Sequence, residues 1–143
     1  MSARSTQDGS VTLLGMGIVV MMLFVGGLAF DLWRLVGERR VLADAADAAA
    51  AAGANAIDVD GYRHDGRLDL DPALARATAA ASLASQPDLA SLTRVAVSAS
   101  PDVVVVRLDG RVELVLLDLF APGQAVELRV EAQAAPRRGA ADP

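Results

Sequence analysis

The chain contains no cysteine and a single histidine, His64, in 143 residues. The lack of cysteine excludes disulfides, thiol nucleophiles and thiolate ligands for metals. His64 has no second histidine to complete a zinc site, and the sequence holds no nucleophile-elbow motif and no glycine-rich phosphate-binding motif. The sequence therefore argues against catalysis and against a bound cofactor, and we expect a protein that is not an enzyme.

Lysine is absent as well: all thirteen basic residues are arginine, and the formal net charge is −5. An acidic protein repels nucleic-acid phosphates, so nucleic acid is not an expected partner. With no catalytic motif, a small-molecule substrate is not expected either. Aromatic residues make up only 3% of the chain. A core of valine, leucine and alanine with few rings is thin, which predicts modest stability.

The main feature that is present is an uncharged apolar run from Val11 to Phe30. Twenty helical residues span about 30 Å, the hydrocarbon thickness of a bilayer, and their backbone hydrogen bonds close within the helix. We therefore expect a short polar N-terminus at residues 1–10 and a transmembrane helix at residues 11–30. Trp33, just beyond the run, is typical of a membrane-interface aromatic residue.

A cleaved signal peptide is the alternative interpretation of this run. The run exceeds a signal-peptide core of about 7–15 residues, and only one arginine, Arg4, precedes it, so an uncleaved anchor is favoured. Small residues at Gly27 and Ala29 leave cleavage open. Release by signal peptidase would give a secreted soluble binding protein instead of a membrane protein.

Residues 31–56 contain no proline, and their composition continues the helix as a stalk beyond the apolar run. Opposite charges at helical spacing, such as Asp31 with Arg34, support this expectation. The end of the segment is mostly alanine, which has two interpretations: helix propensity alone, or a smooth ridge that lets a helix or sheet approach closely. The ridge would consist of small residues on one face (Ala45, Ala48, Ala49, Ala52, Gly53 and Ala56).

Residues 57–135 are expected to form a small exported domain, followed by a flexible tail at residues 136–143. The domain begins with an acidic, turn-rich stretch, residues 58–71, in which Asp58, Asp60 and Asp65 suggest calcium. The EF-hand pattern fails, because Tyr62 stands at its fifth position and no glutamate stands at the twelfth. A solvated loop that includes His64 is the expected structure, and a calcium-regulated adhesin stays open as an alternative.

A second, short helix is predicted to begin at Asp71 and Pro72, with aspartate as the N-cap and proline at the first helical position. It would end before Pro87. A weakly apolar face would pack on a sheet (Leu74, Ala77, Ala81 and Ala84).

Beyond Leu92 the apolar period changes from helical to two, which predicts three half-buried strands. Their buried sides are expected to be apolar (Val95, Val97 and Ala99; Val104, Val106, Leu108, Val112 and Leu114; Val126, Leu128, Val130 and Ala132). The predicted fold class is α+β: a long transmembrane and stalk helix, a second short helix, and a small antiparallel sheet of about three strands.

The pair Asp109-Gly110 resembles a hairpin turn, but a two-residue turn there would pair Leu108 with Arg111 on one face. The alternation runs unbroken through Gly110, so we expect one long strand that is bent or bulged at the glycine. Residues 116–120 would leave this strand, and Pro122-Gly123 would turn the chain into the last one.

Several short motifs follow one another near the N-terminus: Gly9-Ser10, an apolar run that ends in Asp31, three arginines, and the alanine-rich stretch Ala45–Ala50. In this order they resemble the TadE/TadG-like proteins of the tight-adherence (Flp) pilus-assembly system. The later segments also look like TadG-type relatives. The resemblance implies a pilin-like fold and a structural role as a minor pilin or pseudopilin. It also implies membrane lipid, other pilin or pilus-assembly proteins, and further copies of the chain as partners.

Charge counting and the resemblance give opposite topologies. Three arginines (Arg34, Arg39 and Arg40) follow the apolar run closely and one precedes it, which favours a cytoplasmic C-terminal domain. The resemblance implies a bacterial single-pass membrane protein with a cytoplasmic N-terminus and an extracytoplasmic C-terminal domain. A translocated domain can override a weak charge signal, so we expect the second orientation.

The resemblance also points to a processing site. Prepilin-type cleavage would cut after Gly9 and leave Ser10 as the new N-terminus. Such proteins usually carry glutamate at the fifth mature position, where this chain has Leu14, so we expect a permanently anchored form and leave cleavage open. Anchoring and helix packing are expected at eight positions (Leu14, Gly26, Gly27, Asp31, Ala45, Asp47, Ala49 and Ala52).

Overall fold

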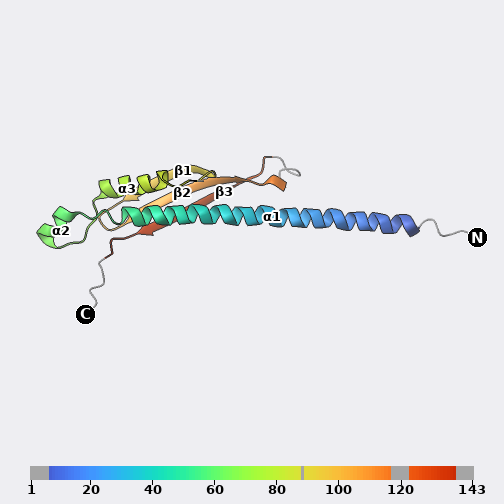
Figure 1. The fold of residues 1–143 in the computed structure, drawn as a ribbon, viewed down its shortest axis with the longest axis horizontal. Helices are drawn as coiled ribbons and strands as arrows, with labels where there is room; N and C mark the ends of the chain where they lie inside the picture. The colour runs from blue at the N-terminus through green and yellow to red at the C-terminus, as the bar shows by residue number, and fades with distance from the viewer. Residues whose placement is uncertain (1–6, 88, 117–122, 138–143) are drawn as a thin grey trace, which may run out of the picture. The chain divides into compact units, whose positions relative to one another are not determined.

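The computed structural model describes residues 7–87, 89–116 and 123–137. Three helices precede three strands: α1 (Gln7–Gly53), α2 (Val59–Asp65), α3 (Pro72–Ala84), β1 (Leu92–Ala99), β2 (Val104–Glu113) and β3 (Ala125–Ala134) (Figure 1). The strands form one sheet in the order β1-β2-β3, and β1 and β2 are antiparallel. The α+β prediction is confirmed. The short helix α2, within the predicted loop, was not predicted.

The described residues fall into two compact units. The first contains α1 up to Val36 and the segment Glu113–Gln124. The second, called the head below, contains Gly37–Val112 and the chain from Ala125 onward. Helix α1 is continuous through Asp31, as predicted, and ends at Gly53, three residues before the expected Ala56. In the described residues it begins at Gln7, so it also includes the end of the predicted polar N-terminus, residues 1–10.

The core of the head lies between one face of the sheet and two helices, the second half of α1 and α3. The inward side chains of β2 alternate as predicted: Val104, Val106, Leu108 and Val112 are buried, as is Gly110, and the alternate residues point outward. Strand β3 follows the same alternation with Leu128, Val130 and Ala132 buried. Strand β1 is less covered, and its Val95 stays partly exposed.

Residues 37–53 of α1 contribute a cluster of small buried side chains and one large one, Leu42. Leu42, Ala45, Ala46, Ala49 and Ala50 are each at most 2% exposed. This part of the predicted stalk is therefore a core element of the head, and its alanines give the sheet and α3 room to lie close to the helix backbone.

Helix α3 begins as predicted, because the Asp71 carboxylate accepts hydrogen bonds from the backbone N–H groups of Ala73 (2.8 Å) and Leu74 (3.1 Å). The predicted packing face was wrong. The buried residues are Ala75, Ala79 and Leu83, whereas the predicted face is exposed (Leu74, Ala77, Ala81 and Ala84). In an alanine-rich helix the hydrophobic pattern distinguishes faces poorly, and close contact with α1 decides which small residues turn inward.

Replacing Asp71 by alanine is expected to lower the free energy of unfolding of the head by about 1 kcal/mol, because two backbone N–H groups lose their acceptor. Amide hydrogen exchange of α3 peptides measures this loss. Asp102→Ala, at an exposed position in the β1–β2 loop, removes the same charge and serves as the control. Equal effects of the two substitutions would contradict the capping role.

The segment between α1 and α3 is closed at its base and contains a helix. The Asp58 carboxylate caps α2 by accepting from the Gly61 N–H (3.0 Å), and Gly66 ends the helix in the left-handed conformation (φ 72°). At the base, the Asp58 N–H donates to the Asp69 carbonyl (2.9 Å). The signal for α2 was in the sequence, as an aspartate cap followed eight residues later by glycine, but it is short.

Strand β2 runs through Gly110 without a turn, so the prediction of one long strand is confirmed. The irregularity lies in the partner strand: Leu92 pairs with Gly110 and Arg94 with Asp109, which leaves Thr93 as the extra residue of a bulge in β1. Gly110 is needed for close packing. A Cβ atom there would lie 2.6 Å from Leu42 Cδ1 and 3.1 Å from the Ser91 carbonyl oxygen.

The predicted turn after β2 falls mostly outside the described residues. Strand β2 ends at Glu113, so the chain leaves it at Leu114, before the expected residues 116–120. Residues 117–122, which include the predicted Pro122 turn position, lie outside the description. Gly123 has a positive φ of 85°. Of the predicted tail, residues 138–143 lie outside it as well.

Candidate functional site

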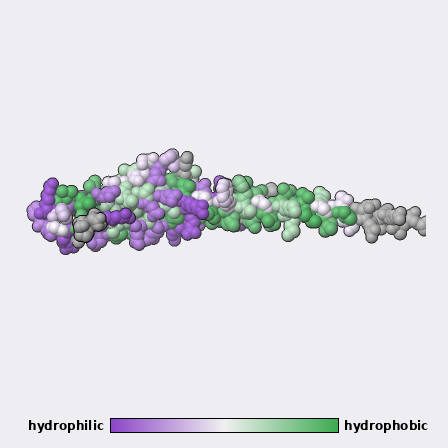
Figure 2. Space-filling model, turned by 60° about the horizontal axis from the view of Figure 1, so that its bottom comes forward, coloured by the Kyte–Doolittle hydropathy of each residue, from purple (hydrophilic) through white to green (hydrophobic). Residues whose placement is uncertain are grey.

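In the described part of the chain, α1 is the one helix long and apolar enough to cross a bilayer. From Val11 to Phe30 every residue except Gly27 is exposed. Figure 2 shows the resulting hydrophobic surface along this part of the helix. An apolar surface of this length is far larger than the patches that water-soluble proteins expose, and it suits lipid. A signal sequence near the N-terminus would satisfy the same criterion of length and composition.

At the end of this run, α1 contacts the segment that follows β2. Asp31 is 2% exposed, and its Oδ2 atom accepts a hydrogen bond of 2.9 Å from the backbone N–H of Leu116. One turn earlier, a Cβ atom on Gly27 would lie only 2.7 Å from Leu116 Cδ1. On the neighbouring Gly26 it would meet nothing within 4 Å. We call the set Gly27, Asp31 and Leu116 the Leu116 clasp.

Within the head, the ridge of small residues allows close packing of α1 on α3 and β2. A Cβ atom on Gly53 would lie 2.9 Å from the Ala75 carbonyl oxygen, 3.1 Å from Val104 Cγ1 and 3.3 Å from Ala79 Cβ. Ala45 and Ala49 are buried in the same interface. The ridge is used inside the head, and it is rotated from the predicted one: Ala46 and Ala50 are buried, Ala48 is exposed and Ala52 is half-buried.

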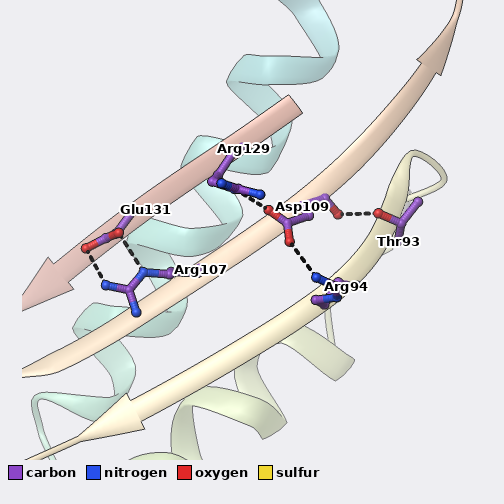
Figure 3. Close-up of polar contacts among 6 residues, drawn as sticks. All are labelled: Thr93, Arg94, Arg107, Asp109, Arg129 and Glu131. Atoms are coloured by element: carbon purple, nitrogen blue, oxygen red, sulfur yellow. Dashed lines mark hydrogen bonds and ion pairs between the residues drawn. The ribbon is translucent and has the colours of Figure 1, made fainter. Parts of the chain in front are cut away.

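The outer face of the sheet carries a ladder of opposite charges across the three strands (Figure 3). Arg107 on β2 forms a two-pronged ion pair with Glu131 on β3, with N–O distances of 2.7 and 3.2 Å. Asp109 accepts from Arg129 at 2.9 Å on one side and faces Arg94 at 3.8 Å on the other. These cross-strand pairs align the strands, but they are solvent-exposed and screened by salt.

The carboxylates raise the pKa of both paired arginines above the ordinary value. For Arg107 the main cause is its hydrogen bond to Glu131, and for Arg129 it is the hydrogen bond to Asp109, with charge attraction second in each case.

One open hollow of about 510 Å³ lies on the sheet near the bulge. Its lining is dominated by charged side chains from all three strands (Arg94, Asp109, Arg111, Glu127 and Arg129). Ligand pockets are mostly apolar with a few placed polar groups, so this hollow has the character of a wet surface groove.

The predicted processing residues lie in the first turns of the described part of α1. Gly9 and Ser10 are helical, and Leu14 is exposed among the other apolar side chains. Asp47 points to solvent on the second half of the helix. Cleavage after Gly9 and anchoring by Leu14 and Gly26 stay predictions.

The described residues contain no cluster of three or more side chains able to hold a metal ion. The aspartates of the expected loop are used separately: Asp58 and Asp71 cap two helices, and Asp65 accepts from the Arg67 N–H at 3.0 Å. His64 is exposed, and its Nδ1 atom donates to the Asp60 carbonyl oxygen at 3.0 Å. Nothing in this arrangement brings a nucleophile and a base together.

Two features of the site escaped sequence reasoning. The contact between Asp31 and Leu116 joins positions 85 residues apart, and no local pattern indicates it. The charge ladder had a signal, because polar positions of β2 and β3 alternate in sign, but choosing partners requires the register of the sheet.

A known protein family matches the N-terminal part of the chain. Residues 9–56 match the family model described as "Putative Flp pilus-assembly TadE/G-like". No curated protein and no solved structure matches the chain. The matched segment contains nearly all of α1, including the apolar run and the first buried alanines of the head. The resemblance to the Tad family is thereby confirmed for the N-terminal segment: residues 9–56 are similar to TadE/G-like proteins, and the match does not extend beyond Ala56.

Proposed function

We propose that this protein is a membrane-anchored, non-enzymatic structural component of a Flp/Tad-type pilus or a related secretion assembly, similar to a minor pilin. One observation carries the proposal: the family match coincides with a helix that is exposed and apolar in its first part and buried in the head in its second. The absence of an assembled catalytic or metal-binding group among the described residues is compatible with a contact role.

In this proposal the apolar part of α1 holds the protein in the membrane, with the N-terminus in the cytoplasm and the head outside. The head then offers its charged sheet face and its exposed helix surfaces to other pilin or pilus-assembly proteins, or to further copies of the chain. Leu14, in place of the glutamate usual in pilins, favours a subunit that stays in the membrane over one that feeds a growing fibre.

Protease protection in cells tests the orientation. The full chain carries an epitope tag at its C-terminus, and spheroplasts are treated with protease before and after lysis. We expect the tag to be lost from intact spheroplasts and the tagged protein to resist extraction from membranes at alkaline pH. A tag that is degraded only after lysis would overturn the exported orientation.

N-terminal sequencing of the mature protein separates the anchor from its alternatives. A start at Met1 or Ser2 fits a permanent anchor, and a start at Ser10 fits prepilin-type processing with the helix retained. A start near Asp31, together with recovery in the soluble fraction, would favour the secreted binding protein and overturn the membrane role.

A further inference from the structure

The segment that follows β2 is apolar and partly exposed in the first unit of the chain. Leu114, Val115 and Leu116 come directly after a strand whose exposed residues are all charged, and Val115 is 57% exposed. A connection in water is normally polar, and three consecutive apolar residues there mark a functional surface or a liability. The position of this segment along α1 indicates which environment surrounds its apolar side chains.

The Leu116 clasp holds this segment at a defined level of α1. Leu116 packs against Gly27, which lies inside the exposed apolar run and three residues before its last member, Phe30. At the helical rise this is about 5 Å below the end of the run. If the run spans a bilayer, the side chain of Leu116 lies at the level of the outer hydrocarbon and not in water.

Asp31 supplies a hydrogen-bond acceptor for the backbone N–H of Leu116, which lies beyond the end of β2. Backbone N–H groups near the hydrocarbon must find an acceptor within the protein, because water is scarce there. The buried Oδ2 atom of Asp31 accepts a hydrogen bond from the Leu116 N–H and so supplies that acceptor from within the protein. An aspartate directly after an apolar run is therefore suited to docking this segment.

On these grounds we infer that the start of the β2–β3 connection, Leu114–Leu116, is a second membrane-contacting element. Its occupant is the lipid of the outer leaflet. Asp31 and Gly27 position the segment against the anchor helix, and Val115 points its exposed side chain into the acyl chains. The inference rests on the proposed membrane anchoring of α1, and it adds a second contact that restrains the protein at the interface.

Depth-dependent fluorescence quenching tests the inference, and the absence of native cysteine makes every introduced thiol unique. Single-cysteine variants of the full chain are labelled with a nitrobenzoxadiazole dye and reconstituted in two sets of phosphatidylcholine vesicles, which contain lipids spin-labelled either near the headgroup end of the acyl chain or deep in the chain. Val115→Cys is the test position, Phe30→Cys marks the end of the run, Val20→Cys marks the middle of the span, and Ala80→Cys marks the exposed side of α3.

We expect the Val115→Cys probe to lose fluorescence to a degree comparable with Phe30→Cys, while Ala80→Cys loses little. Quenching of Val115→Cys only at the level of Ala80→Cys, with Val20→Cys quenched by lipids spin-labelled deep in the chain, would overturn the inference and leave the anchor intact. Failure of Val20→Cys to be quenched by the lipids spin-labelled deep in the chain would overturn the anchor itself and, with it, the inference.

Second-site substitutions test the positioning residues. Combined with Val115→Cys, we expect Gly27→Leu to reduce quenching to the Ala80→Cys level, since a side chain there displaces Leu116. Gly26→Leu, the adjacent glycine with open space, is expected to leave quenching unchanged. Asp31→Ala is expected to reduce it, and Asp31→Asn, which keeps an acceptor oxygen, to restore part of it. Equal behaviour of the two glycine variants would overturn the clasp.

Discussion

Replacing Leu42 by alanine is expected to lower the free energy of unfolding of the head by about 2–5 kcal/mol, the range for a large-to-small change in a packed core. Leu42 is fully buried and is one of the largest side chains in a core otherwise rich in alanine and valine. Its Cδ1 atom rests on Gly110, which has no side chain that could move into the vacated space. The cavity should therefore stay open, and the loss should lie toward the upper end of that range.

The total free energy of unfolding of a small domain is about 5–15 kcal/mol, so such a loss should leave a detectable fraction of the head unfolded. Amide hydrogen exchange of β2 and β3 peptides, in the full chain held in nanodiscs, measures it without interference from the anchor helix. Val41→Ala removes a partly exposed side chain one position earlier and should cost far less. Similar exchange rates in the two variants would show that Leu42 is not a core residue.

The second large effect on the stability of the head is expected from a substitution of Gly53. Gly53→Ala is expected to destabilise the head by about 1–3 kcal/mol, because the new methyl group overlaps the Ala75 carbonyl and the side chains of Val104 and Ala79. The carbonyl is backbone and cannot rotate away, so relief requires α1 to move away from α3.

Gly37→Ala is the matched control, since Gly37 lies in the same helix and the position that its new methyl group would take has nothing within 4 Å. There the gain in helix propensity should act alone and raise stability by about 0.5–1 kcal/mol. The two substitutions are chemically identical and should have opposite signs in the same hydrogen-exchange measurement. A stabilising Gly53→Ala would mean that α1 and α3 are not in close contact.

The sequence predicted the secondary structure well where one pattern dominated. The apolar run predicts a helix, because a helix of this length forms all its backbone hydrogen bonds internally. The alternation predicts which face of each strand is buried, because a one-residue slip would exchange the two faces. Prediction failed for the face of α3, where nearly every candidate residue is alanine. Alanine on any side of such a helix is equally apolar, so composition does not identify the buried face. The close contact of Ala75 and Ala79 with Gly53 identifies it.

The candidate site was predictable in part for a related reason. The anchor depends on composition over twenty residues of sequence, and the family match depends on short motifs along one helix. Asp31 was singled out as the residue that ends the apolar run, but its partner could not be named, because Leu116 comes next to it only through the three-dimensional path of β2. Predicting a contact between distant segments requires the three-dimensional path of the chain, whereas the sequence predicted only the fold class.

Gly110 has a further consequence for how the strands find their alignment. Sliding β1 by two residues along β2 would preserve the alternation of inward and outward side chains, so alternation alone cannot distinguish the two registers. In the observed register the Ser91 carbonyl and Leu42 both occupy the space beside Gly110. After such a slide the carbonyl would meet the buried side chain of Leu108 or Val112 instead. The absence of a side chain at Gly110 thus permits the observed register of β1 and β2 and disfavours the registers shifted by two residues.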